Sequence, residues 1–257
     1  MIIDIHTHID KEKIYQQYLK KSKNKVAKIL VMEWLKSKDL EGLIRFVESK
    51  KNLFVAAAIN FNKDISQQLE SREKLFKENK IIGIKLYPGY QHFYASDPKI
   101  YPIATLCQKY NKPLIFHTGD VWDPDNEAIL KYSHPIYIDD LAVKFPKCKI
   151  ILAHLGFPYH LEAANVVSKN KNVYTDISGT LDSPRKDLLN QYIKDLTRVF
   201  AYSPIVKEKI MFGTDYSGEN TPLKEIDNYI KIVKRVFSPE EQKNVFYKLA
   251  EKLFFTD

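Results

Sequence analysis

Two histidines near the start of the chain have the spacing of a metal site. His6 and His8 form a His-x-His pair within the apolar phrase Ile-Asp-Ile-His-Thr-His-Ile. If this phrase is a strand, alternate side chains point to the same side and both imidazoles can reach one cation. A pair placed by chance on a surface strand is the alternative, and the apolar surroundings favour ligation.

Three later polar residues also follow apolar runs. His117, in Pro-Leu-Ile-Phe-His-Thr-Gly, is either a third nitrogen ligand suited to Zn²⁺ or another borderline metal, or a core histidine bonded to a carbonyl. Asp215 ends the run Ile-Met-Phe-Gly-Thr-Asp, where a carboxylate needs a partner such as a metal and its water, unless it caps a helix. His154, in Ile-Ile-Leu-Ala-His-Leu-Gly, is a fifth ligand or an acid/base.

Three further residues are candidates for contact with the substrate. Lys85, in Gly-Ile-Lys-Leu-Tyr-Pro, has three interpretations: it binds an anionic substrate group, it is carbamylated and bridges two metals, or it pairs with a carboxylate for structural reasons. His92 follows shortly after and is a candidate in the next loop. Arg185 could hold a carboxylate with two hydrogen bonds, or it is a surface arginine near a helix start.

The elements that must position these residues recur along the chain. Short runs rich in β-branched residues predict eight strands, at residues 2–8, 26–32, 53–60, 81–87, 113–117, 149–154, 172–178 and 209–215. The segments between them have helical periodicity, as at residues 97–110. This alternation predicts parallel βαβ units, and eight of them predict closure into a single (β/α)8 TIM barrel.

The end of the chain supplies the eighth helix, at residues 238–255. Ser238 is a plausible N-cap and Pro239 takes the first helical position. The length of 257 residues suits one barrel, and no linker or low-complexity tract interrupts the series. We therefore expect one domain over residues 1–257.

A barrel brings the polar residues together, because the carboxyl ends of all its strands meet at one face. We expect Asp4 to share the inward side of its strand with His6 and His8, where it orients a ligand histidine or is satisfied within the barrel. A divalent metal held there would lower the pKa of a bound water to about 7. Asp215 would then accept a proton during attack, and His154 would stabilise the developing oxyanion.

Composition argues against several other classes of protein. The chain has 40 basic and 32 acidic side chains, a net charge of +8, but the lysines are scattered, so no nucleic acid is expected. Cys107 and Cys148 form no CxxC pair and are interpreted as buried thiols in a reducing compartment. No apolar run has the length of a membrane span, and we expect a cytoplasmic enzyme acting on a small molecule, with a homo-oligomer left open.

These residues taken in order resemble the amidohydrolase superfamily. The phrases Ile-Asp-Ile-His-Thr-His, Gly-Ile-Lys-Leu-Tyr-Pro, Ala-His-Leu-Gly, Val-Tyr-Thr-Asp-Ile-Ser-Gly and Phe-Gly-Thr-Asp-Tyr are similar to its amidohydrolase-related branch of TIM-barrel metal-dependent hydrolases. The resemblance implies one divalent metal on His6, His8, His117 and Asp215, with His154 against the nucleophile or substrate. Zn²⁺ is the first choice of metal, with Mn²⁺, Fe²⁺ and Co²⁺ as alternatives.

The branch contains more than one kind of reaction. Its hydrolases imply cleavage of an ester, lactone, amide or related bond, and its non-oxidative decarboxylases, such as aminocarboxymuconate semialdehyde decarboxylase, are the alternative. This chain is shorter than expected for those decarboxylases. TatD-like nucleases share the His-x-His pair but have a glutamate on strand four, where this chain has Lys85. An inactive metal-binding barrel is disfavoured because all five site residues are present.

Overall fold

A ring of eight short parallel strands forms the centre of the molecule. The structure, a computed structural model, describes residues 1–37, 39–121, 127–181, 187–218 and 226–256. The strands are β1 (Ile3–Thr7), β2 (Lys28–Met32), β3 (Leu53–Ala58), β4 (Gly83–Leu86), β5 (Leu114–Phe116), β6 (Ile150–Leu152), β7 (Val173–Asp176) and β8 (Ile210–Met211). All eight lie within the runs predicted from the sequence.

The strands pair in chain order, each parallel to the next. Because β8 has only two residues, the ring closes partly through hydrogen bonds that the chain after β8 accepts from residues 5 and 8. The amide of Ile5 donates to the carbonyl of Phe212 (3.1 Å), and the amide of His8 donates to the carbonyl of Tyr216 (2.7 Å). The predicted (β/α)8 TIM barrel is therefore confirmed.

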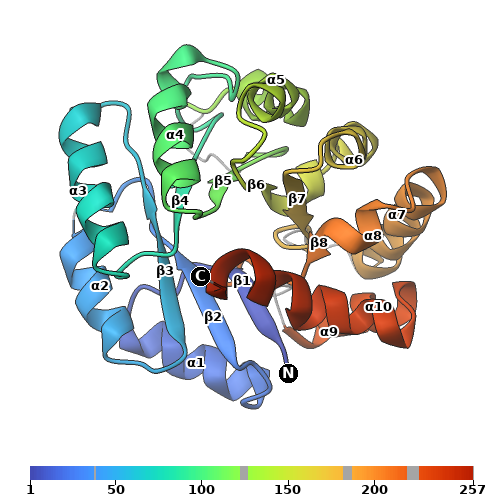
Figure 1. Ribbon diagram of the computed structural model, residues 1–257. Helices are drawn as coiled ribbons and strands as arrows, with labels where there is room; N and C mark the ends of the chain where they lie inside the picture. The colour runs from blue at the N-terminus through green and yellow to red at the C-terminus, as the bar shows by residue number, and fades with distance from the viewer. Residues whose placement is uncertain (38, 122–126, 182–186, 219–225, 257) are drawn as a thin grey trace.

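Helices surround the strands on the outside, as Figure 1 shows. They are α1 (Glu12–Ser22), α2 (Leu40–Glu48), α3 (Ile65–Lys77), α4 (Tyr101–Lys109), α5 (Ile138–Lys144), α6 (His160–Lys169), α7 (Leu188–Tyr202), α8 (Val206–Lys209), α9 (Ile226–Val236) and α10 (Pro239–Lys243). Short 3₁₀ turns are η1 (Pro98–Ile100), η2 (Leu130–Ser133), η3 (Pro135–Tyr137) and η4 (Ala153–Gly156). The π-helical segments η5 (Asn244–Lys248) and η6 (Glu251–Phe255) continue from α10.

The start of α10 matches the sequence prediction. The Ser238 hydroxyl accepts a hydrogen bond from the amide of Glu241, whose carboxylate in turn accepts from the amide of Ser238. This capping box satisfies two amides that have no partner inside the helix. No helix among the described residues is both long and apolar enough to cross a membrane.

The core has two layers. The larger contains the outward-facing strand residues and the inner faces of the helices, and includes the buried free thiols of Cys107 and Cys148. The smaller fills the barrel with inward-facing residues such as Leu30 and Ile115, packed against Leu253 and Phe254 near the end of the chain. The C-terminal segment therefore covers one mouth of the barrel (Figure 1). The candidate site residues follow the carboxyl ends of the strands.

The expected position of Asp4 is wrong, because β1 is not regular. Its register with β2 shifts between Asp4 and Thr7. Ile5 belongs to the barrel interior, whereas the Asp4 carboxylate accepts a hydrogen bond from Tyr18 of α1 (2.7 Å), outside the ring. Across such an irregularity, side chains no longer alternate strictly between the two sides of the strand. Asp4 and His6 therefore do not share a side.

Candidate active site

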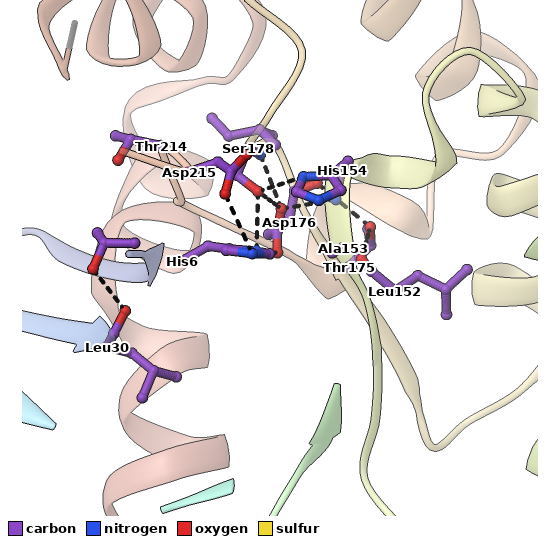
Figure 2. Close-up of polar contacts among 12 residues, drawn as sticks. His6, Leu30, Leu152, Ala153, His154, Thr175, Asp176, Ser178, Thr214 and Asp215 are labelled. Atoms are coloured by element: carbon purple, nitrogen blue, oxygen red, sulfur yellow. Dashed lines mark hydrogen bonds and ion pairs between the residues drawn. The ribbon is translucent and has the colours of Figure 1, made fainter. Parts of the chain in front are cut away.

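Three ligand-type side chains meet where β1 and β8 end. Nε2 of His8 lies 3.3 Å from Oδ1 of Asp215, and Nε2 of His6 lies 3.6 Å from the same oxygen. The amide of Asp215 donates to the carbonyl of His6 (2.7 Å), so the backbone holds the two ligand segments together. Figure 2 shows Asp215 and His6 pointing toward one another.

The hydrogen bonds of the two histidines decide which nitrogen is free to bind a metal. Nδ1 of His8 lies 3.1 Å from the carbonyl of Met32, and a carbonyl can only accept, so Nδ1 carries the proton. Nδ1 of His6 lies 3.1 Å from the Asp176 carboxylate, with the same consequence. Both Nε2 atoms therefore have lone pairs, and these are the atoms that lie near Asp215.

The spacing fits one divalent ion. Ligands about 2.1 Å from a tetrahedral ion lie roughly 3.4 Å from one another, and the two distances to Asp215 Oδ1 are 3.3 and 3.6 Å. Burial, followed by the charge of Lys85, lowers the pKa of His6 to about 4, which keeps this imidazole neutral as a ligand must be. The Asp215 side chain is 15% exposed, so its carboxylate is partly accessible to solvent, whereas His6 and His8 are buried.

A second group of three ligand-type residues shares His6 but is a weaker metal site. His6, His154 and Asp176 also have ligand atoms within 4.8 Å of one another. The Asp176 oxygens already accept from His6 Nδ1, from the amides of His154 and Ser178, and from the Ser178 hydroxyl. Binding a metal there would break hydrogen bonds of a fully buried carboxylate, whereas the group with His8 and Asp215 breaks none of these.

His117 lies nearby but outside both groups. Its Nε2 lies 2.9 Å from the carbonyl of Asp120, which places the proton on Nε2 and leaves Nδ1 free. Its ring centre is 5.1 Å from that of His154 and 5.0 Å from that of Tyr90. Burial, with the charges of His154 and Lys85, holds the pKa of His117 well below its ordinary value, so the ring is neutral.

His154 lies beside the first group in a bent segment of the chain. Its φ is +65°, a left-handed conformation that turns the chain sharply after β6. Its ring centre is 4.8 Å from that of His6, and Nδ1 lies 2.9 Å from the Ser178 hydroxyl. Burial lowers the pKa of His154 to about 3, so this ring too is neutral.

Lys85 points into the barrel from β4. Its side chain is only 1% exposed, and Nζ lies 3.4 Å from Nε2 of His6. Burial lowers the pKa of Lys85 to about 8, and the charges of Asp176 and Asp215 oppose this effect. The ammonium is thus a buried cation directly beside the candidate ligands.

His92, another candidate for substrate contact, makes its contacts outside this arrangement. Nε2 of His92 lies 2.9 Å from the carbonyl of Glu127, and its ring stacks on Tyr132 with a centre distance of 5.4 Å. These contacts join the loop after β4 to the segment around η2. Arg185 lies outside the described residues.

Sequence reasoning did not assign roles to three residues at this site. Asp176 and Ser178 belong to the phrase Val-Tyr-Thr-Asp-Ile-Ser-Gly, whose polar residues after an apolar strand were the available signal. Trp34 stacks on His8 with a centre distance of 3.7 Å and an interplanar angle of 15°, yet is 42% exposed. An isolated tryptophan in a loop carries no comparable signal.

Comparison with known proteins gives a family and a fold. The chain matches the family described as Amidohydrolase over residues 45–256. A curated relative, Protein fluG of Emericella nidulans, is 26% identical over 112 residues, which are 44% of this chain and only 12% of that protein. This chain thus matches a small part of a much longer protein.

Two solved structures illustrate the range of reactions on this fold. A probable 2-pyrone-4,6-dicarboxylic acid hydrolase of Acinetobacter baumannii has a TM-score of 0.70 at 14% identity, with 99% of each chain covered. A 5-carboxyvanillate decarboxylase of Novosphingobium aromaticivorans, with bound manganese, has a TM-score of 0.60 at 14% identity, covering 95% of this chain and 85% of that one. At such identities the likeness concerns the fold. The match over residues 45–256 places this chain in the amidohydrolase family.

Proposed function

We propose that this protein is a metal-dependent hydrolase that cleaves an ester, lactone, amide or related bond of a small molecule. The observation that supports this most is the convergence of His6 Nε2 and His8 Nε2 on one oxygen of Asp215, at 3.6 and 3.3 Å, on the open side of the barrel. In this proposal His6, His8, Asp215 and the free Nδ1 of His117 hold one divalent ion. A bound ion supplies Lewis-acid polarisation and makes water more acidic.

The residues around the ion have separate tasks in the proposed reaction. Asp215 accepts a proton from the attacking water, because its carboxylate lies beside both ligand histidines and is partly open to solvent. His154 has its Nδ1 against the Ser178 hydroxyl, which itself donates to Asp176, so Nε2 is left as an acceptor. His154 therefore suits a proton acceptor or a further ligand better than an oxyanion donor.

The position of Lys85 favours a substrate that carries an anionic group. A cation held by His6 Nε2 would stand close to the Lys85 ammonium, which lies 3.4 Å from that nitrogen. Two neighbouring positive charges in a buried site favour an anion between them. The unmodified ammonium, rather than a carbamate bridging two metals, is therefore part of the proposal, with a carboxylate or a developing oxyanion as its partner.

Decarboxylation of an unsaturated or aromatic acid is the second candidate. The manganese-bound decarboxylase shares this fold, and the buried ammonium of Lys85 would attract a carboxylate substrate in either reaction. What separates the two reactions is the product, because a decarboxylase releases carbon dioxide and a hydrolase does not.

Metal analysis followed by a substrate screen tests this proposal. Purified protein is stripped with a chelator, reloaded separately with Zn²⁺, Mn²⁺, Fe²⁺ or Co²⁺, and analysed for metal per chain. We expect one ion per chain in the wild type and loss of the ion in His6→Ala and His8→Ala. Each loaded form is then assayed on esters, lactones, amides and carboxylic acids, with carbon dioxide measured in parallel.

The outcomes separate the alternatives. Hydrolysis without carbon dioxide supports the hydrolase, and carbon dioxide release from an acid supports the decarboxylase. Two ions per chain would contradict the single-metal site and favour a carbamylated Lys85. Absence of stoichiometric metal from every loaded form would refute the proposal.

A further inference from the structure

Residues at the end of β7 and in the turn after it contact the rings of both His6 and His154. In each ring the contacted atom is Nδ1. Asp176 is fully buried and accepts four hydrogen bonds: from His6 Nδ1 (3.1 Å), the amide of His154 (3.0 Å), the amide of Ser178 (2.9 Å) and the Ser178 hydroxyl. Figure 2 shows this carboxylate between the two imidazoles. One side chain of β7 is thus bonded to β1, to the chain after β6 and to its own turn.

The Ser178 hydroxyl lies between the same two rings. Its Oγ is 2.9 Å from Nδ1 of His154 and 3.2 Å from Nδ1 of His6. A hydroxyl has one proton, and here that proton is donated to Asp176, so its lone pairs can only accept from the rings. Both imidazoles must therefore carry their proton on Nδ1 and present Nε2 on the opposite side.

Two glycines allow this close approach. A Cβ on Gly179, which has φ +69°, would lie 2.3 Å from Nδ1 of His154. A Cβ on Gly213 would lie 3.1 Å from the Cβ atoms of both His6 and Ser178. No ordinary side chain fits at either position without moving these residues, so the backbone of the turn and of the segment after β8 is shaped around the two rings.

We propose that Asp176 and Ser178 are a pair of positioning residues that fix the same tautomer in His6 and His154. By holding both protons on Nδ1, the pair leaves Nε2 of His6 for a metal and Nε2 of His154 as an acceptor. Its consequences for turnover rest on the proposed function, but the tautomers themselves do not. Partners of this kind orient ligand histidines and support both metal affinity and activity.

The direct test is the protonation pattern of the rings, observed by ¹⁵N NMR on metal-free protein with labelled histidine at neutral pH. In the wild type we expect His6 and His154 to be in the Nδ1–H form. Ser178→Ala removes the acceptor of His154 and should convert that ring to a mixture of tautomers or to the Nε2–H form. His6 should change less, because Asp176 remains.

Thr180→Val is the matched control, since Thr180 is a buried hydroxyl residue of the same turn and its Oγ1 lies 3.5 Å from the carbonyl of Ile177. This variant should leave both ring patterns unchanged. Asp176→Asn should disturb both rings. If Asp176→Asn does not fold, Ser178→Ala and its control still decide the matter.

Measurements of metal affinity and of turnover then distinguish the role of Asp176 from that of Ser178. We expect Asp176→Asn to weaken metal binding by roughly 10- to 100-fold, and Ser178→Ala to lower kcat by a similar factor with a smaller effect on metal affinity. Nε2–H rings in the wild type, or identical spectra for Ser178→Ala and the wild type, would overturn the inference. A protein that shows the expected tautomers but binds no metal would refute the proposed function and leave the positioning pair intact.

Discussion

In the proposed function Asp215 has two tasks, as a metal ligand and as a proton acceptor. It is the shared neighbour of His6 and His8, and its φ of +59° lies in the left-handed region that a residue with a side chain adopts at a cost. The hydrogen bond from its amide to the carbonyl of His6 helps to hold this conformation. The strained backbone therefore fixes the carboxylate beside His6 and His8, where the proposed function requires it.

Asp215→Asn tests this double role. An amide oxygen can still contact a cation but is a very poor proton acceptor, so we expect turnover to fall by at least about 100-fold while some metal binding survives. Metal content and turnover are measured on the same preparation. Near-normal turnover would show that the proton goes to another group, with His154 the next candidate.

Lys85→Met tests the buried ammonium. Methionine has a similar length and shape without the charge, so this substitution removes the ammonium and keeps most of the side-chain packing. We expect KM for anionic substrates to rise by about 10-fold or more, neutral substrates to be affected less, and metal content to be unchanged. Loss of metal from this variant would instead identify the lysine as part of the metal site.

At the scale of elements, the side chain of Asp4 joins β1 to the segment after β8, where the two strands share little backbone pairing. Asp4 accepts hydrogen bonds from the amide of Thr214 (3.1 Å), its hydroxyl (2.7 Å), Tyr18 of α1 (2.7 Å) and the amide of His6 (3.2 Å). Burial raises the pKa of Asp4 to about 7, although these donors oppose the effect. Asp4 thus links a helix, the first strand and the segment leading to Asp215.

Two variants should show how much this link contributes. Tyr18→Phe removes one donor and should lower the free energy of unfolding by about 1 kcal/mol. Asp4→Ala leaves several buried donors without a partner and should cost clearly more, about 3 kcal/mol or above. Urea denaturation measures both. Equal effects for the two variants would contradict a shared role of the carboxylate.

The same region shows why sequence reasoning succeeded for the strands and missed some contacts. Runs such as Ile-Ile-Leu before His154 identify buried parallel strands, because both faces of such a strand are apolar. The role of Asp176 depends on partners 170 residues away along the chain, at His6. The side taken by Asp4 depends on a local irregularity in β1. Neither the spacing of residues along the chain nor their types indicate which distant partner Asp176 has or which side of the strand Asp4 takes.

For the whole molecule, the buried histidines should make stability depend on pH. The folded-state pKa is about 4 for His6, about 3 for His154 and well below normal for His117, against about 6.5 in an unfolded chain. Between pH 6.5 and 4 the unfolded state binds protons on these rings and the folded state does not. Acidification over this range therefore favours unfolding.

Asp4 has the opposite effect over the same range. With its pKa raised to about 7, it is protonated in the folded state and ionised in the unfolded chain above about pH 4, so its contribution to stability is present at low pH and lost as pH rises through 7. Burial also lowers the pKa of His160 and raises the pKa of Glu33, so four rings against two carboxyls leave a net loss of stability on acidification.

We expect the metal-free protein to lose about 1–3 kcal/mol of unfolding free energy per pH unit between pH 6 and 4.5. Urea denaturation across this range measures it. A flat or rising stability on acidification would show that these rings are protonated in the folded protein.

The closure of the ring between its first and last strands has a consequence for how the protein is made. His6 and His8 are synthesised more than 200 residues before Asp215 and its neighbour Thr214. Because N-terminal segments emerge and begin to fold first, a nascent chain lacking β8 contains both histidines but not the carboxylate that lies beside them. The candidate ligands are thus brought together only in the step that turns an open sheet into a barrel, and a chain that stops before β8 lacks part of the proposed metal site.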